Sequence, residues 1–285
     1  MSQLFTINNT FESYQKLIGF YQEHKNKVFD TIHLEIRNWF AANMCATLGS
    51  ILDKFTDNLN TIKIDYISPD IETILLKNDF LSYYGRARIT DDHHTTIKFL
   101  KLKPTDGKFF KKYVIEELIG RSELPQMSAL LKEKMTEAIY EIFVNAQIHS
   151  NSENIYTCGQ FFPRENKIEF TIVDTGIGFK RKINERFGKN LSAVQAIEWA
   201  VKDRHTTKIG ITGGIGLAFL KEFVTNNKGK MQIVSDDGFY QFDSKAESMN
   251  TFNASFPGTI VNLQFRTDDK NSYLLKNEIN SNDIF

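Results

Sequence analysis

A single long amphipathic helix constrains the fold of this 285-residue chain more than any other feature of its sequence. Apolar side chains recur at three- and four-residue spacing after Pro125, and no helix breaker occurs before Ser150. These side chains belong to Met127, Leu130, Leu131, Met135, Ala138, Ile139, Ile142, Phe143 and Ala146. So broad a stripe predicts a helix that packs on a core along its whole length.

Strands and two further helices are expected after this helix. The runs "NIYTCGQFF" (154–162) and "KIEFTIVD" (167–174) are rich in β-branched and aromatic residues and flank a polar turn. One helix is expected from Leu191 to Val201 and another after Gly216, and "MQIVS", "FYQF" and "TIVNLQF" favour three more strands. The pattern predicts a sheet packed against helices.

The first hundred residues show a separate alternation of helix and strand patterns. Helical spacing occurs in 10–27, 43–57 and 71–80, and strand patterns occupy 28–36 and 61–67. This order is typical of a small α/β domain. The basic stretch that follows, with a turn signal at Pro104 to Gly107, is expected to be a connector leading into a helix.

Composition and charge argue against several classes of function. Lys and Arg together number 35, as do Asp and Glu, so no general attraction to nucleic acid is expected. The sequence shows neither a signal peptide nor an apolar segment of the ~20 residues that span a membrane. Cys45 and Cys158 lack metal-ligand spacing, which is typical of a reducing compartment. We therefore expect a soluble, cytoplasmic protein with no membrane partner.

Three polar residues of the long helix are candidates for a functional site. Glu141, Asn145 and His149 are spaced by four residues, so their side chains lie on one line beside the apolar stripe. The alternative is a solvated helix edge, and the spacing alone does not separate the two interpretations.

Two glycine clusters accompany these residues. Asp174 begins "DTGIGF" at the end of a strand pattern, while "TGGIGLAFLKEF" (212–223) opens a helix pattern, where free N–H groups favour phosphate. Neither cluster is a P-loop, because the Gly-Lys-Ser/Thr ending is absent, and neither fits the dinucleotide-binding fingerprint.

In chain order these segments resemble the GHKL ATP-binding superfamily, the group of gyrase B, histidine kinases and MutL. Glu141 and Asn145-Ala146 match the N box, "DTGIGF" the G1 box, "GGIGL" the G2 box and Gly258-Thr259 the G3 box. The segment "NNKGKMQIVSDDG" is similar to the chain after the G2 helix in histidine kinases. The resemblance covers about residues 126–266 and implies a Bergerat fold with ATP and Mg²⁺ as ligands.

The resemblance also implies roles for individual residues. Glu141 would orient or deprotonate the attacking water in members that hydrolyse ATP, and Asn145 would be a Mg²⁺ ligand. Asp174 would accept a hydrogen bond from the adenine amino group, where guanine has a carbonyl oxygen, and Thr259 would support the base. The other candidate ATP-binding residues are His149, Gly176, Gly178, Gly214 and Gly216, and the candidate cations of a mobile lid are Lys180, Arg181, Lys182, Arg186, Arg204 and Lys208.

The sequence departs from histidine kinases in one important respect. None of its six histidines lies in a phosphoacceptor box, so a histidine autokinase is not expected. The segment "DDHH" (91–94) could bind a metal or be a solvated loop. The N-terminal half contains "FAANMCATLGSILDKF" (40–55) followed by "TIKIDYI" (61–67) and "ILLKNDFL" (74–81). With this order it resembles STAS-like domains fused to GHKL modules, which implies a regulatory or interaction role. It lacks their Asp-Ser-x-Gly phosphorylation site, although Ser68 lies at a comparable strand end.

Three functions are compatible with these patterns. They are an ATP-dependent switch with slow hydrolysis, an anti-sigma-type serine/threonine kinase, and an ATP-gated interaction module that does not hydrolyse ATP. A protein partner or a homodimer is expected besides ATP. The expected fold class is α+β, with a Bergerat-type sandwich whose mixed sheet has helices on one face. The expected domains are a STAS-like domain (1–100), a basic connector (101–125), a GHKL domain (126–268) and a polar tail (269–285).

Overall fold

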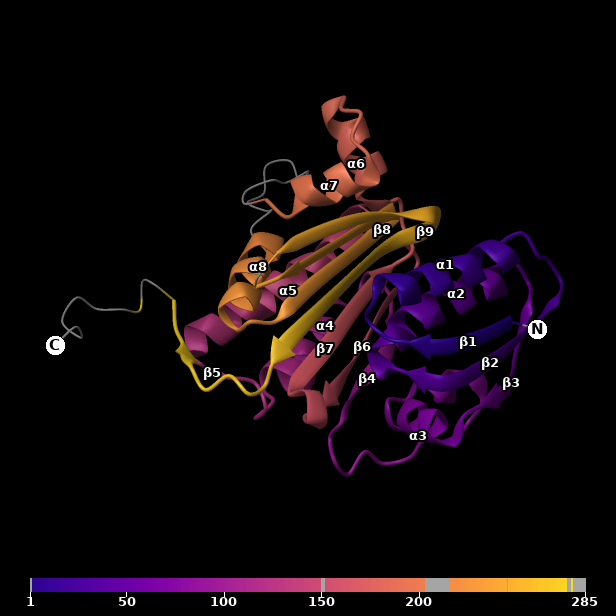
Figure 1. Cartoon of the computed structure of the whole chain (residues 1–285), viewed down its shortest axis with the longest axis horizontal. Helices are drawn as coiled ribbons and strands as arrows, with labels where there is room; N and C mark the ends of the chain where they lie inside the picture. The colour runs from indigo at the N-terminus through magenta and orange to yellow at the C-terminus, as the bar shows by residue number, and fades with distance from the viewer. Residues whose placement is uncertain (1, 150–151, 203–215, 245, 276–277, 279–285) are drawn as a thin grey trace.

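The computed structural model describes residues 2–149, 152–202, 216–244, 246–275 and 278, and its fold is α+β as expected (Figure 1). The first unit contains β1 (Ser2–Ile7), α1 (Phe11–His24), β2 (Thr31–Phe40), α2 (Cys45–Asp57), β3 (Thr61–Ile67) and α3 (Pro69–Lys77). The rest contains β4 (Thr96–Leu102), α4 (Gly107–Val114), β5 (Gln126–Met127), α5 (Ala129–His149), β6 (Ile155–Phe162), β7 (Lys167–Asp174), α6 (Gly178–Phe187), α7 (Ala193–Ala200), α8 (Gly216–Asn226), β8 (Lys230–Asp243), β9 (Glu247–Arg266) and β10 (Ser272–Tyr273).

The first unit is a parallel sheet with helical crossovers. Its strand order is β1-β2-β3, and both pairings are parallel. Thr10 caps α1, since its side chain accepts a hydrogen bond from the Ser13 N–H, and Pro69 begins α3 with the fixed φ that suits a first helical residue. Each helix and strand pattern predicted here overlaps an observed element, whereas β1 was not predicted.

The second sheet has the strand order β4-β6-β7-β9-β8, and each of its pairings is antiparallel. The prediction of a mixed sheet is wrong. Short connections, such as the turn at residues 163–166 between β6 and β7, can join only antiparallel neighbours. "MQIVS" and "FYQF" were predicted as two strands, but they form one long strand, β8, with a register shift between Ser235 and Gly238.

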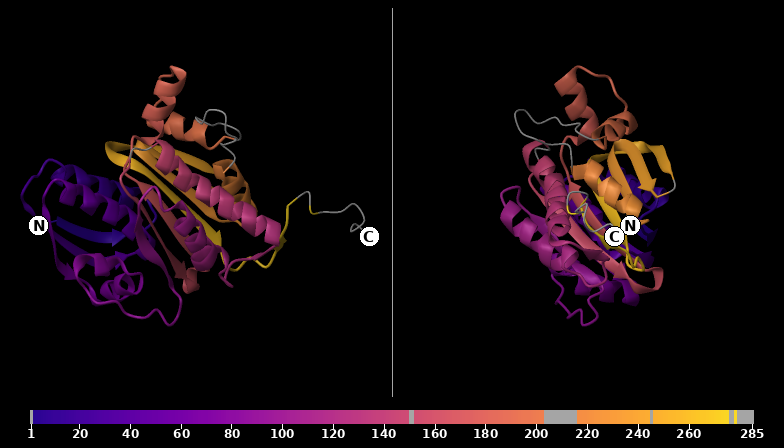
Figure 2. Two further views of the ribbon diagram at one scale, coloured as in Figure 1. Left: turned by 180° about the vertical axis from the view of Figure 1, so that it is seen from behind. Right: turned by 90° about the vertical axis from the view of Figure 1, so that its left-hand side faces the viewer.

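The second unit's own helices α4, α5 and α8 share one core on one face of the second sheet, and helices of the first unit cover the opposite face. Seen from behind, α5 lies across the sheet, and α4 and α8 flank it (Figure 2). The opposite face packs against α1 and α2 of the first unit (Figure 1). Strand β7 shows why both faces are buried: Ile168, Phe170 and Ile172 belong to the core around α5, whereas Val173 belongs to the core shared with the first unit.

A buried polar seam links the first unit to the second sheet. Asn43, which is fully buried, donates to Asn9 Oδ1 at 2.8 Å and to Thr171 Oγ1 at 3.0 Å. Asn262 donates to Glu169 Oε2 at 2.7 Å, and its own Oδ1 accepts from Thr171. Because buried polar groups need partners, these bonds specify how the first unit sits on the sheet.

The segments expected to be a connector and a tail both take part in the second unit. Residues 96–102 form β4, which pairs with β6, and α4 follows at once. At the other end, Ser272 and Tyr273 pair with Gln126 and Met127, and the Tyr273 carbonyl accepts from Ser128 N–H at 2.9 Å. Backbone pairing therefore holds residues 101–102 and 272–273 in the second unit, and such pairing leaves little trace in sequence composition.

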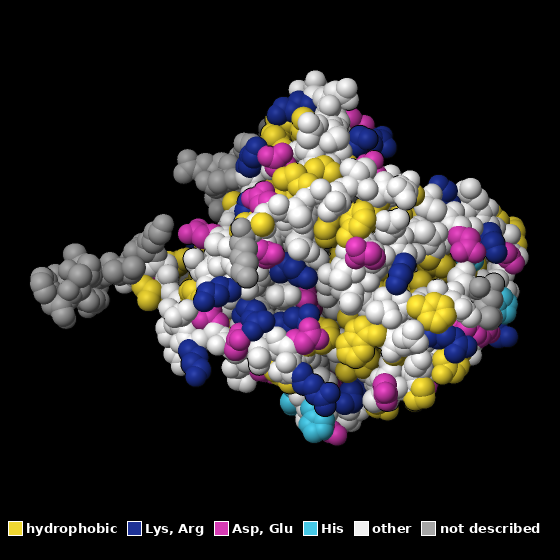
Figure 3. Space-filling model, in the orientation of Figure 1, with side chains coloured by type: hydrophobic (Ala, Val, Ile, Leu, Met, Phe, Trp, Pro, Cys, Tyr) yellow, Lys and Arg dark blue, Asp and Glu magenta, His cyan; other side chains and the backbone are white. Residues whose placement is uncertain are grey.

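The distribution of charged side chains and the state of the two cysteines agree with what the composition led us to expect. Lys, Arg, Asp and Glu side chains are interspersed over the face shown in Figure 3. Cys45 and Cys158 are buried free thiols. Within the described ranges, no helix is both long enough and apolar enough to cross a lipid bilayer.

Candidate functional site

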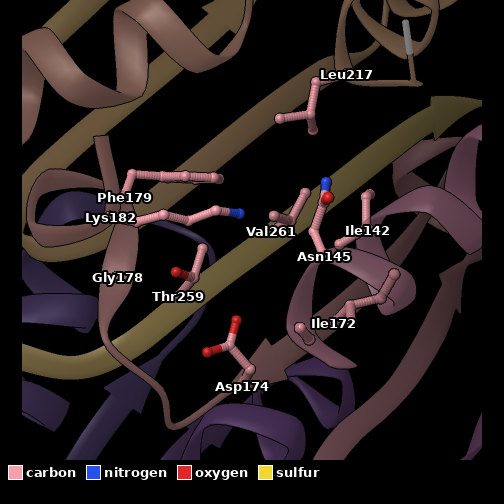
Figure 4. Close-up of a pocket in the computed structure, with 11 residues that line it drawn as sticks. Ile142, Asn145, Ile172, Asp174, Gly178, Phe179, Lys182, Leu217, Thr259 and Val261 are labelled. Atoms are coloured by element: carbon pink, nitrogen blue, oxygen red, sulfur yellow. The ribbon is translucent and has the colours of Figure 1, made fainter. Parts of the chain in front are cut away.

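A pocket opens where α5, β7, α6, α8 and β9 meet (Figure 4). Its polar lining residues are Asn145, Asp174, Lys182 and Thr259, and its apolar lining residues are Ile142, Ala146, Ile172, Phe179, Leu217 and Val261, with Gly178 at the edge. Four residues predicted from three sequence motifs, Asn145, Asp174, Gly178 and Thr259, therefore line one cavity. Folding brings them together across more than a hundred residues of chain.

Two lining residues of the pocket, Asp174 and Thr259, belong to a row of three paired residues on neighbouring strands. Asp174 at the end of β7 is the cross-strand partner of Thr259 on β9, and Thr259 is in turn the partner of Ser235 on β8. Gly258 allows this pairing, since its φ is +146° and a Cβ there would lie 2.0 Å from the Asp174 carbonyl oxygen. Ser235 was not predicted; its position at the end of "MQIVS" was the signal available.

Asp174 has an environment that differs from that of a surface carboxylate. Burial raises its pKa from the ordinary 3.8 to about 6, and the Gly176 N–H and the Lys182 ammonium oppose that rise. The Gly176 N–H donates to Asp174 Oδ1 at 2.9 Å. Because burial makes this carboxylate costly to ionise, it is suited to a ligand that donates a hydrogen bond to it.

The turn after Asp174 leads directly into α6. Gly178 has a φ of +70°, and a Cβ there would lie 2.7 Å from Asp236 Oδ2. The next N–H, that of Phe179, donates to Ser235 Oγ at 2.9 Å. Helix α6 itself was not predicted, because this stretch was assigned to a mobile lid. It places Lys182, one of the lid cations suggested by the sequence, at the pocket (Figure 4).

Glu141 lies one turn before Asn145 on α5 but does not line the pocket. Its Oε2 accepts a hydrogen bond from the Gly216 N–H, the first residue of α8, at 2.8 Å. A Cβ at Gly216 would lie 2.7 Å from that same oxygen. Glu141, the candidate base, thus contacts the start of α8, which was predicted to face phosphate. This hydrogen bond joins a residue of the N box to a residue of the G2 box.

The remaining predicted residues fall into two groups. Gly176 contacts the site through its N–H to Asp174. The side chain of His149, although its backbone ends α5, and the whole of Gly214 lie outside the described residues. The same holds for Arg204 and Lys208.

The "DDHH" segment has a structural use for its first carboxylate. Asp91 accepts from the Thr96 N–H at 2.7 Å, from Thr96 Oγ1 at 2.8 Å and from Thr95 Oγ1 at 3.1 Å. Over the part of the chain that the structure describes, no three His, Cys, Asp or Glu side chains come together as metal ligands. The solvated-loop interpretation of this segment therefore fits the structure better than a metal site.

Comparison with known proteins adds no identification. No protein-family model matches the chain, and no curated protein matches it either.

Proposed function

We propose that this chain is a GHKL-type, Bergerat-fold protein that binds Mg-ATP between α5, β7 and α8 and works as a nucleotide-dependent switch with slow ATP hydrolysis. The observation that carries the proposal is the pocket shared by Asn145, Asp174 and Thr259. The sequence motifs predicted that these residues act together, and nothing in their separate positions along the chain requires them to be neighbours.

Asp174 and Thr259 would form the adenine end of the site. Their side chains lie side by side in the pocket as cross-strand partners (Figure 4). The Asp174 carboxylate would accept from the exocyclic amine of adenine, a hydrogen bond worth about 1.5–3 kcal/mol because one partner is charged. Guanine presents an oxygen there, so it would be rejected. The apolar walls formed by Ile142, Ile172 and Val261 suit a flat ring.

Asn145 would form the metal end. Its amide group projects into the pocket from α5 (Figure 4). A single protein oxygen fits Mg²⁺, which usually keeps several waters and takes the rest of its ligands from phosphate. When bound, Mg²⁺ would neutralise phosphate charge. The backbone N–H groups at the start of α8 would supply further donors to the phosphates.

Binding would require α6 to shift. The cavity at this pocket measures about 30 Å³, room for only a water or two. Phe179 and Lys182 of α6 occupy its mouth (Figure 4). Helix α6 would therefore act as a lid that moves outward to admit the base and then closes with Lys182 near the ligand, and this movement would be the switch.

Glu141 would be the base that activates water for hydrolysis. In the structure its Oε2 is held by the Gly216 N–H. Arrival of phosphate at the start of α8 would compete for that N–H and release the carboxylate. The first unit, which packs on the sheet opposite α5, would be a STAS-like regulatory or partner-binding module.

Mg-ATP affinity measured by calorimetry tests the proposal. The wild-type chain should bind, Asp174→Asn should bind much more weakly, and Asp92→Asn, at an exposed loop carboxylate, should bind normally. Equal affinity of wild type and Asp174→Asn, or no binding by either, would overturn the assignment. Labelled γ-phosphate then separates the alternatives: free phosphate indicates an ATPase, and label on a partner protein indicates a kinase of the anti-sigma type. Binding without turnover would indicate a non-hydrolysing module.

A further inference from the structure

A second, larger pocket lies at the junction of the first unit and the second sheet. It has a volume of about 550 Å³ and is bordered by α2, the start of β3, the short helix at Phe80–Tyr84, and strands β4 and β6. This volume falls in the range of small-molecule sites, and its lining mixes aromatic rings with a few polar groups, as such sites do. It is separate from the proposed ATP pocket, and none of its lining residues is shared with that pocket.

One carboxylate organises the polar side of this junction pocket. Asp53 of α2 accepts from the Tyr156 hydroxyl at 2.6 Å and pairs with the Lys101 ammonium. Lys101 on β4 and Tyr156 on β6 are cross-strand partners, so the sheet presents both groups to α2 from one register position. Among the described residues, both contacts are made at Asp53 Oδ2, which leaves Oδ1 able to accept from a ligand.

Burial and the nearby Asp53 raise the pKa of Tyr156, so its phenol remains a proton donor at every physiological pH. The Lys101 ammonium has three protons and uses one on Asp53, so it can donate to a ligand as well. An open acceptor and an open donor thus lie next to each other. Because the charges of Asp53 and Lys101 already balance, a neutral ligand fits better than an ionic one.

The aromatic side of the pocket offers a flat, partly open ring surface. Tyr83 is 49% exposed and meets Phe99 edge-on at 5.1 Å. Phe99 is buried and is itself fixed edge-on by Phe80 at 5.1 Å. A large aromatic ring held in place at a pocket rim provides a stacking surface for another planar ring.

We propose that the junction pocket binds a neutral, nucleoside-sized molecule whose ring carries an N–H next to a carbonyl, as in guanine and uracil. The ring N–H donates to Asp53 Oδ1, the neighbouring carbonyl accepts from Lys101, and the ring packs on Tyr83. Adenine has no ring carbonyl, and cytosine has no N–H beside its carbonyl in the nucleoside. This preference for guanine or uracil over adenine is therefore opposite to the preference proposed for the Asp174 pocket, which favours adenine over guanine. A ligand here touches α2 and two strands of the sheet, so its binding stabilises the contact between the two units.

Calorimetric titration of the full chain with guanosine, uridine, adenosine and cytidine tests this site. The Asp174→Ala chain is used throughout, so that the side chain of residue 174 cannot hydrogen-bond a base in the other pocket. Guanosine or uridine should bind, with Kd at least about tenfold lower than for adenosine and cytidine. Tyr83→Ala and Asp53→Asn should each weaken that binding by about tenfold or more. Asp57→Asn, an exposed carboxylate one turn along α2, should leave it unchanged.

Tyr83 is exposed, so its replacement keeps the test valid if Asp53→Asn fails to fold, which circular dichroism would show. Absence of saturable binding by both guanosine and uridine would overturn the proposal. So would binding of all four nucleosides with equal affinity, or binding that Tyr83→Ala leaves intact. None of these outcomes bears on Mg-ATP binding at Asp174, which is measured separately on the wild-type chain.

Discussion

Glu141 Oε2 and the Gly216 N–H are joined by a hydrogen bond of 2.8 Å, which fastens the middle of α5 to the first residue of α8. The first N–H groups of a helix have no partner within the helix, so a carboxylate is a natural acceptor for one of them. A phosphate is the other natural acceptor. The contact therefore places a candidate base at the point where the proposed phosphate site begins, and it makes both residues testable.

Glu141→Gln should separate hydrolysis from binding. Glutamine keeps an oxygen that can accept from Gly216 but cannot take a proton from water, so ATP turnover should fall by about 10²–10⁴-fold. ATP affinity should stay within a few-fold of wild type. Steady-state phosphate release and calorimetry measure the two quantities. Glu137→Gln, on an exposed part of the same helix, is the control and should hydrolyse normally. An undiminished rate in Glu141→Gln would remove the residue from this role.

Gly216→Ala should disturb the contact between α5 and α8. A Cβ there would lie 2.7 Å from Glu141 Oε2 and 3.0 Å from the Ala138 carbonyl oxygen, and the second of these is backbone that cannot rotate away. We expect the free energy of unfolding to fall by about 1–3 kcal/mol and ATP affinity to weaken.

Urea denaturation with Gly19→Ala as the matched control measures the effect of Gly216→Ala. Gly19 lies within α1, and a Cβ there would meet nothing within 4 Å. That variant should be more stable than wild type by about 0.4–1 kcal/mol, because alanine restricts the unfolded chain. If both alanine variants were equally stable, the close approach at Gly216 would be of no consequence.

Recognition by Asp174 should depend on pH. The carboxylate must be ionised to accept from adenine, and its pKa in the folded protein is raised to about 6. Affinity should therefore be constant above pH 7 and fall by up to about tenfold per pH unit below pH 6. Adenosine is the ligand of choice, because it has no phosphate that titrates in this range. Binding that is the same at pH 7.5 and pH 5 would show that Asp174 does not hold the base.

Ionisation of the buried Asp174 carboxyl should lower the free energy of unfolding. A carboxyl whose folded pKa exceeds its ordinary 3.8 favours the folded state at low pH, and this contribution is lost as pH rises from about 4 through 6. Asp174→Asn keeps an acceptor for the Gly176 N–H without the buried charge. At pH 7.5 it should raise the free energy of unfolding by about 1–3 kcal/mol, and near pH 4 the difference should vanish. Urea titrations at both pH values check this. A variant less stable than wild type at pH 7.5 would contradict it.

Local patterns in the sequence were enough to predict most elements of the fold. The strand from Thr61 to Ile67 and the strand from Lys167 to Asp174 have the predicted bounds, because alternation and flanking turns mark both ends. The apolar stripe likewise predicted α5, which Ser128 caps by accepting from the Leu131 N–H.

What the sequence did not predict depends on contacts between distant segments. The strand order of the second sheet depends on pairings between distant segments, such as β7 with β9, and its far face is covered by packing against α1 and α2. In the site, Asp174 and Thr259 could be named from motifs. Ser235 could not, since a lone serine at a strand end acquires meaning only from its cross-strand partner. Helix α6 is short and strongly charged, so its sequence resembled a loop.

Asn43 provides the test of how firmly the first unit is fixed. It is completely buried and donates to Asn9 Oδ1 at 2.8 Å, to Thr171 Oγ1 at 3.0 Å and to Asn262 Oδ1 at 3.3 Å. Asn43→Ala removes these donors, so the buried Asn9 Oδ1 loses its hydrogen bond at 2.8 Å, and leaving a buried polar group unsatisfied costs about 1–3 kcal/mol. We expect a loss of about 2–4 kcal/mol in the free energy of unfolding.

Urea denaturation followed by both tryptophan fluorescence and circular dichroism measures this loss. Trp39 lies in the first unit and Trp199 in α7, so fluorescence follows both parts of the chain. Asn190→Ala, at an exposed residue, should be neutral. If the seam fixes the first unit on the sheet, the two signals should coincide in wild type and separate in Asn43→Ala as the units lose cooperativity. An Asn43→Ala chain as stable as wild type, with coincident transitions, would mean that apolar packing alone holds the first unit to the sheet.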